Sequence, residues 1–113
     1  MPSKLQKRPL RIKRGGYEGL AAVVLYSSSL KPVADHEVVL VKDHFVHLSP
    51  RQQEILHLRF GLAEETNPIA LEAIGNKWGI TRERVRQLQD RALKKLRVVI
   101  EEKVTIKVEE INN

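Results

Sequence analysis

Residues 82–97, RERVRQLQDRALKKLR, place seven basic and two acidic side chains in one short segment. Four side chains near its start have the chemistry to bond the edges of nucleic-acid bases: Arg82, Glu83, Arg86 and Gln87. An arginine can form two hydrogen bonds with guanine, a glutamine can do so with adenine, and a glutamate can accept one from the cytosine amino group. A merely solvated helix face more often alternates glutamate with lysine. The segment therefore predicts a surface that contacts a nucleic acid.

These four side chains need a helix to position them. The sequence predicts one that begins at Arg82, directly after the cap residue Thr81. Its apolar residues recur on one face: Val85, Leu88, Ala92, Leu93 and Leu96. Because this face points into the core, we expect the four polar side chains to point outward.

A shorter helix is expected before it, separated by a tight turn. Asn67 and Pro68 form a cap-and-proline start signal, and Gly79 is expected to end the helix with a positive φ. Gly75 is expected where the two helices approach most closely, so that only a small side chain fits there. Two short helices joined by such a turn form a helix-turn-helix, whose second helix enters the major groove of DNA.

Another helix is predicted to start at Pro50. Ser49 is its expected cap, and Gln52 completes a capping box three residues later. Gly61 is the expected stop signal. The apolar side of this helix and its ends consists of Leu48, Ile55, Leu56, Leu58, Phe60 and Leu62.

The flanking segments have weaker patterns. Residues 17–47 are rich in valine and leucine and are interrupted by SSSLKPVAD, which favours two short strands or a strand and a helix. Near the C-terminus, Val104, Ile106 and Val108 alternate with other residues, which indicates a strand that pairs with residues 37–46.

The expected fold is therefore mainly α, with a small β element formed by residues before Leu48 and after Lys103. The chain is divided into four parts: a basic flexible arm at 1–16, an extension at 17–47, a helix-turn-helix domain at 48–100 and a C-terminal extension at 101–113.

The net charge of +6 is concentrated in two blocks. Residues 1–16 carry six basic and no acidic side chains, and residues 82–97 form the second block. This distribution is typical of a nucleic-acid binder with a mobile arm and one docking face, although the first block could also be a solubilising tail.

The composition also excludes several kinds of site. The chain has no cysteine, which excludes disulfides and thiolate metal sites and favours a reducing compartment such as the cytoplasm. No segment approaches membrane-spanning length, so no membrane contact is expected. The four histidines lack supporting ligands, and Ser27, Ser28 and Ser29 lack a histidine-acid partner, so the sequence predicts neither a metal, nor a cofactor, nor an enzyme.

From Leu48 to Arg97 the sequence resembles region 4 of the primary-type bacterial sigma factors. The stretches that carry the resemblance are LSPRQQEILHLRFGL and LEAIGNKWGITRERVRQLQDRALKKLR. In that family, region 4 reads the minus thirty-five element of double-stranded promoter DNA while bound to the β flap of the RNA polymerase core. The resemblance implies base contacts from the four side chains named above.

Further contacts follow from the same resemblance and from the charges near it. The residues expected at DNA phosphates are Thr81, Arg51, Arg59, Arg84, Arg91 and Lys94. For Arg51 and Arg59 the alternative is a role in the domain scaffold, and for Arg91 and Lys94 it is exposure to water. The residues implied at the polymerase flap are Ile55, Leu56, Phe60, Leu93 and Leu96, which are also expected in the core.

The sequence departs from the family pattern in several places. Ala70 stands where many members have threonine, and Gln89 stands where glutamate is common. The domains that melt promoters and clamp polymerase are not recognisable, so a separate sigma region 2-like subunit or an anti-sigma factor is an expected partner. The first hypothesis is a promoter-reading part of a split sigma factor, or a phage or mobile-element regulator. The alternatives are a free-standing helix-turn-helix repressor or activator and a region 4 mimic that binds polymerase or an anti-sigma factor.

Overall fold

The computed structural model describes residues 15–63 and 66–112, with side chains up to residue 104. In chain order its elements are α2 (Gly16–Tyr26), α3 (Asp35–His44), the 3₁₀ helix η1 (Phe45–His47), α4 (Pro50–Phe60), α5 (Leu71–Trp78) and α6 (Arg82–Asn112). The described residues contain no strand, which confirms the mainly α prediction. The basic arm predicted at 1–16 lies outside the described residues except for its last two.

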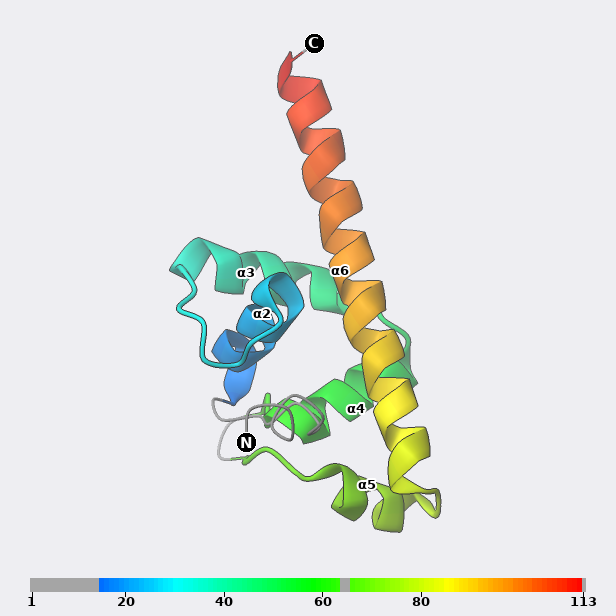
Figure 1. The fold of residues 1–113 in the computed structure, drawn as a ribbon. Helices are drawn as coiled ribbons and strands as arrows, with labels where there is room; N and C mark the ends of the chain where they lie inside the picture. The colour runs from blue at the N-terminus through cyan, green and yellow to red at the C-terminus, as the bar shows by residue number, and fades with distance from the viewer. Residues whose placement is uncertain (1–14, 64–65, 113) are drawn as a thin grey trace, which may run out of the picture.

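The long helix α6 organises the molecule (Figure 1). The other helices pack against its N-terminal and middle turns, and its C-terminal turns project beyond them. One apolar core joins all five α-helices, and its largest fully buried side chains are Phe60, Leu20, Ile55, Leu56, Ile74, Leu96, Val24, Val41 and Val85. Among the described residues no helix is both long and apolar enough to cross a membrane.

The predicted β element is wrong at its first segment, because residues 17–47 form two helices. In α2 the residues from Gly19 to Val24 are all buried, and a helix that is apolar on all sides is stable only inside a core. In α3 the core-facing residues Val38, Val41 and Phe45 recur at helical spacing, and Phe45 directly follows the helix. Core packing therefore overrides the β propensity of the valines.

The strand predicted near the C-terminus is also wrong, because α6 continues to Asn112. The helix contains neither glycine nor proline after Arg82, so no residue interrupts its backbone hydrogen bonds. Its expected partner, residues 37–46, belongs to α3 and η1 and has no strand edge to offer.

The predicted boundaries of α4 are confirmed. The Ser49 hydroxyl accepts a hydrogen bond from the backbone N–H of Gln52 at 3.2 Å, and the Gln52 side chain accepts one from the N–H of Ser49 at 3.1 Å. Gly61 ends the helix with φ +61°.

The predicted start of α5 is wrong by three residues. The helix begins at Leu71, and the preceding segment is extended. The reason is a tertiary contact, since the N–H of Ile69 donates to the carbonyl of Leu58 at 2.9 Å and Arg59 donates to the carbonyl of Ile69 at 2.9 Å. These two bonds hold Ile69 in an extended conformation against α4, so α5 starts after Ile69 and not at the Asn67-Pro68 start signal.

Candidate nucleic-acid interface

The turn between α5 and α6 has the geometry that the sequence predicted. Gly79 has φ +68°, and the N–H of Ile80 donates to the carbonyl of Gly75 at 3.0 Å. A Cβ added to Gly75 would lie only 2.7 Å from the carbonyl oxygen of Ile80. Both glycines are therefore needed for the same tight turn, and this turn sets the direction in which α6 leaves it.

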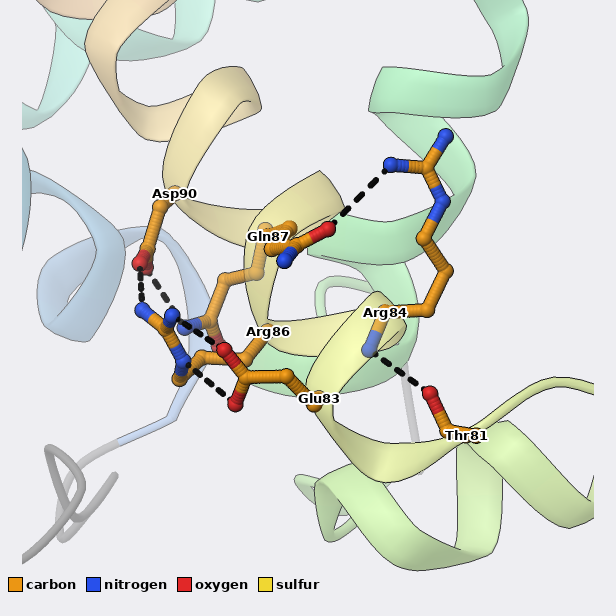
Figure 2. A network of polar contacts seen from close by, with 7 residues as sticks. Thr81, Glu83, Arg84, Arg86, Gln87 and Asp90 are labelled. Carbon is orange, nitrogen blue, oxygen red and sulfur yellow. Dashed lines mark hydrogen bonds and ion pairs between the residues drawn. The ribbon is translucent and has the colours of Figure 1, made fainter.

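Helix α6 begins at Arg82, as expected. The Thr81 hydroxyl accepts a hydrogen bond from the backbone N–H of Arg84 at 3.1 Å, which confirms its role as cap (Figure 2). A capped helix start has its remaining backbone N–H groups and its positive dipole end exposed together, which favours a nearby anion such as a phosphate.

The structure brings the four predicted base-contacting residues together at the start of α6. Arg82, Glu83 and Gln87 are exposed, and the Arg86 side chain is 42% exposed. Val85, between them, is fully buried. The inward and outward faces of the helix therefore lie as the sequence predicted.

Arg86 is held by two acidic side chains of its own helix (Figure 2). Its Nε and Nη2 donate to the Glu83 carboxylate at 3.0 and 2.5 Å, and its Nη1 donates to Asp90 at 2.6 Å. The hydrogen bonds from Arg86 lower the pKa of Glu83, and the bonds to Glu83 raise the pKa of Arg86. The guanidinium is therefore oriented before any ligand arrives.

Arg84 and Gln87 form a second pair on this surface. Nη1 of Arg84 donates to Oε1 of Gln87 at 3.3 Å, and both side chains are exposed (Figure 2). This bond uses the amide oxygen of Gln87, so its amide N–H₂ group remains available as a donor. The other N–H groups of Arg84 are further donors beside it.

Two predicted phosphate contacts lie in very different surroundings. Arg51 is exposed and stacks on Trp78, with its Cζ 3.6 Å from the ring centroid, so it joins the start of α4 to the end of α5. Arg59 is only 7% exposed and donates to Gln89 and to the carbonyl of Ile69. Burial, and secondarily the charge of Arg82, lower the pKa of Arg59. The burial of Arg59 argues against the phosphate contact and favours the scaffold alternative.

Arg91 and Lys94 are exposed on the middle turns of α6. Lys94 also borders a pocket of 310 Å³ between α2 and α6. The pocket is lined by Val23, Val24, Ser27, Asp90, Leu93, Lys94 and Arg97. It has an apolar floor and a charged rim.

The predicted flap-binding residues do not form an open surface. Ile55, Leu56, Phe60 and Leu96 are at most 1% exposed and lie in the core cluster that includes α2. Leu93 is partly buried and borders the pocket described above. In this arrangement of the helices, Leu93 is therefore the one residue of the predicted flap-binding set that a partner could reach.

Sequence reasoning missed the contact between Asp90 and Arg86, the hydrogen bonds of Gln89 and the stacking of Arg51 on Trp78. Asp90 could have been found, because it follows Arg86 by four residues, the spacing at which helix side chains meet. The other contacts join separate elements and leave no local signal in the sequence. Three of the four histidines have structural contacts: the rings of His44 and His47 lie 5.9 Å apart, and the ring of His57 packs edge-on against Phe45 with centroids 5.3 Å apart. No group of three metal-binding side chains occurs among the described residues.

The fold and this site together define a helix-turn-helix protein with a basic second helix. Residues 45–98 match the family described as Sigma-70, region 4. Over these residues the chain is therefore similar to the sigma-70 region 4 family.

Individual proteins show the same similarity. The chain is 36% identical over 94 residues to "RNA polymerase sigma factor RpoS" of Coxiella burnetii, an overlap that covers 80% of this chain and 26% of that protein. It is 46% identical over 50 residues to "RNA polymerase sigma factor SigA" of Clostridium acetobutylicum, which covers 44% of this chain and 13% of that protein. The chain thus spans about a quarter or less of these relatives. No solved structure matches it.

Proposed function

We propose that this protein reads promoter DNA of the minus thirty-five type through the start of α6. The observation that carries the proposal is the exposed group of Arg82, Glu83, Arg86 and Gln87 on a capped helix that follows a helix-turn-helix turn. Such a helix fits the major groove, and these side chain types match base edges. The relatives are named as sigma factors, and the match of residues 45–98 to the region 4 family supports the same role.

The DNA proposal is tested by Arg86→Ala. Loss of one bidentate base contact should weaken binding to the preferred site by about 1–3 kcal/mol and relax the preference at one base pair, with little effect on unrelated DNA. Binding-site selection from random duplexes, followed by fluorescence anisotropy at fixed salt, measures both quantities. Lys95→Ala is the control, because Lys95 is an exposed cation of the same helix without a proposed base contact. An unchanged base preference in the Arg86 variant would contradict the orientation of α6 on DNA.

Docking on the RNA polymerase core, at the β flap, is the second part of the proposal. It is supported by the match of residues 45–98 to the region 4 family and by the pocket between α2 and α6, where Leu93 and two valines form an apolar floor. A partner helix with an apolar anchor and acidic flanks would match this floor and the neighbouring Lys94 and Arg97. Contact with the other four predicted residues would require α2 to move aside. This role would place the protein in the bacterial cytoplasm, on the nucleoid.

One observation favours a second candidate function, a free-standing DNA-binding regulator. Four of the five residues predicted at the flap are buried under the packed helices, and a regulator that works without polymerase has no need to expose them. Such a regulator usually dimerises and binds paired half-sites.

A pull-down separates the two functions. Purified RNA polymerase core and the isolated β flap are used as separate baits for the full-length protein. Retention by both supports docking at the flap, and Leu93→Asp should then abolish retention. Retention by neither bait, combined with sequence-specific DNA binding, would establish the free-standing regulator.

A further inference from the structure

A chain of hydrogen bonds connects the buried scaffold to the base-contacting face. Arg59 of α4 donates through Nε to Oε1 of Gln89 at 2.5 Å, and Nε2 of Gln89 donates to Oδ1 of Asp90 at 3.3 Å. Asp90 accepts from Arg86 through its other oxygen at 2.6 Å, and Arg86 in turn holds Glu83. We call Arg59, Gln89, Asp90 and Arg86 the relay. It begins at a side chain that is 7% exposed and ends at a proposed base contact.

The chemistry of the partners fixes the orientation of Gln89. An arginine can only donate and a carboxylate can only accept, so the amide oxygen must face Arg59 and the amide nitrogen must face Asp90. Gln89 is 4% exposed, which leaves its side chain little room to move. A glutamate at this position could still accept from Arg59, but it could not donate to Asp90 and would repel it.

The relay leaves Arg86 able to contact a base. Of the five N–H donors of its guanidinium, Nε, one on Nη2 and one on Nη1 are used by Glu83 and Asp90. One N–H therefore remains on each terminal nitrogen, and two N–H groups are what a bidentate contact with guanine uses. The two acids hold the guanidinium at both ends, which reduces the conformational freedom that an arginine otherwise loses on binding.

We propose that Gln89 and Asp90 are positioning residues that orient Arg86 and so determine base specificity at the position that Arg86 contacts. This inference rests on the proposed reading of DNA by α6. Asp90 itself places a negative charge near the DNA backbone, so it should weaken binding to DNA of any sequence. Asp90 therefore improves the discrimination between DNA sequences but lowers the overall affinity for DNA.

The first test needs no DNA. In NMR spectra at low temperature, a guanidinium held at both ends should give separate Nη1 and Nη2 signals for Arg86. Asp90→Ala and Gln89→Glu should each merge these signals, and Glu101→Ala should leave them separate. Glu101 is the matched control, since it pairs with Arg97 at i,i+4 on the same helix, at 3.6 Å, away from the relay. Separate signals in both relay variants would overturn the positioning role.

The second test measures specificity with full-length variants in binding-site selection from random duplexes. Asp90→Ala and Gln89→Glu should reduce discrimination at the base pair assigned to Arg86 by at least about fivefold, the lower end of what one bidentate contact contributes. Asp90→Ala should also bind unrelated DNA more tightly, while Glu101→Ala should keep the wild-type discrimination. Full discrimination in both relay variants would overturn the inference even though DNA is read. A wild-type protein that selects no sequence would instead overturn the proposed function, and the NMR test would still decide the positioning role.

Discussion

Glu83 releases its proton more readily than an ordinary glutamate because Arg86 donates two hydrogen bonds to its carboxylate. Its pKa is lowered in the folded protein, so the stability that the pair contributes is present above the pKa of the unfolded chain. That stability is lost as the pH falls through the folded pKa. Arg86→Ala should therefore raise the Glu83 pKa toward its usual value, as measured by an NMR titration of side-chain carboxyl groups.

Glu37 is the internal control for this titration. Its pKa is lowered by other groups, chiefly the backbone N–H of Ala34 and secondly the Tyr26 hydroxyl. It should stay low in the Arg86 variant. A low Glu83 pKa that survives the loss of Arg86 would mean that the pair does not form in solution.

Gly75 allows α5 to approach the start of α6. Gly75→Ala places a methyl group 2.7 Å from the Ile80 carbonyl oxygen, and the helices must shift to accommodate it. We expect a loss of about 1–3 kcal/mol in the free energy of unfolding, measured by urea denaturation. Asn76→Ala, at an exposed neighbouring position, should change it by less than about 0.5 kcal/mol. An equally stable Gly75 variant would show that the turn is looser than the structure indicates.

Single residues were predictable where a local backbone requirement selects the residue type. This group includes the caps Ser49 and Thr81 and the turn residue Gly79. The role of each depends only on the backbone within a few positions. For Arg59 the resemblance left a phosphate contact and a scaffold role open, because the sequence gives the charge of this side chain but not its burial. Its partner Gln89 is 30 residues away and on another helix.

At the scale of elements, α2 is part of the same core as the helix-turn-helix. Leu20 is fully buried and belongs to the cluster with residues of α4 and α6. Leu20→Ala should reduce the free energy of unfolding by about 2–5 kcal/mol and should lower the stability of α4 to α6 in one cooperative transition. Circular dichroism during urea denaturation measures this, and Leu30→Ala is the control because Leu30 is 61% exposed.

This experiment also tests the domain boundaries, which stay a prediction. If residues 48–100 were an independent unit, the Leu20 variant would lose α2 in a separate early transition. The rest of the protein would then unfold as in the wild type.

The helices that have clear cap or stop residues at their ends were predicted more accurately than the helices that lack them. Helix α4 has a capping box and a stop glycine, and α6 has a threonine cap, and both begin where expected. Helices α2 and α3 were predicted partly as strands because valine-rich segments have β propensity, whereas burial against α4 and α6 decides their conformation. Such burial depends on residues far along the chain.

At the scale of the whole molecule, the charge is divided between the first residues and α6. Removing residues 1–14 takes away six basic side chains and no acidic one. We expect weaker binding to all DNA sequences and a shallower dependence of log affinity on log salt, by at most about 5, since each phosphate contact contributes about 0.9. Fluorescence anisotropy from low to moderate salt measures this slope. An unchanged slope would support the alternative of a solubilising tail.

The length and continuity of helix α6 also fix the distance between its two ends. It runs uninterrupted from Arg82 to Asn112, so the turn that carries the proposed base contacts and the projecting end belong to one continuous helix (Figure 1). Glu101 lies roughly 22 Å along the axis from Arg86, at 1.5 Å per residue. A partner bound near Glu101 would therefore be held at a fixed distance and angle from the proposed DNA-contacting residues. Inserting one residue between these positions would rotate the attachment by about 100° around the helix axis.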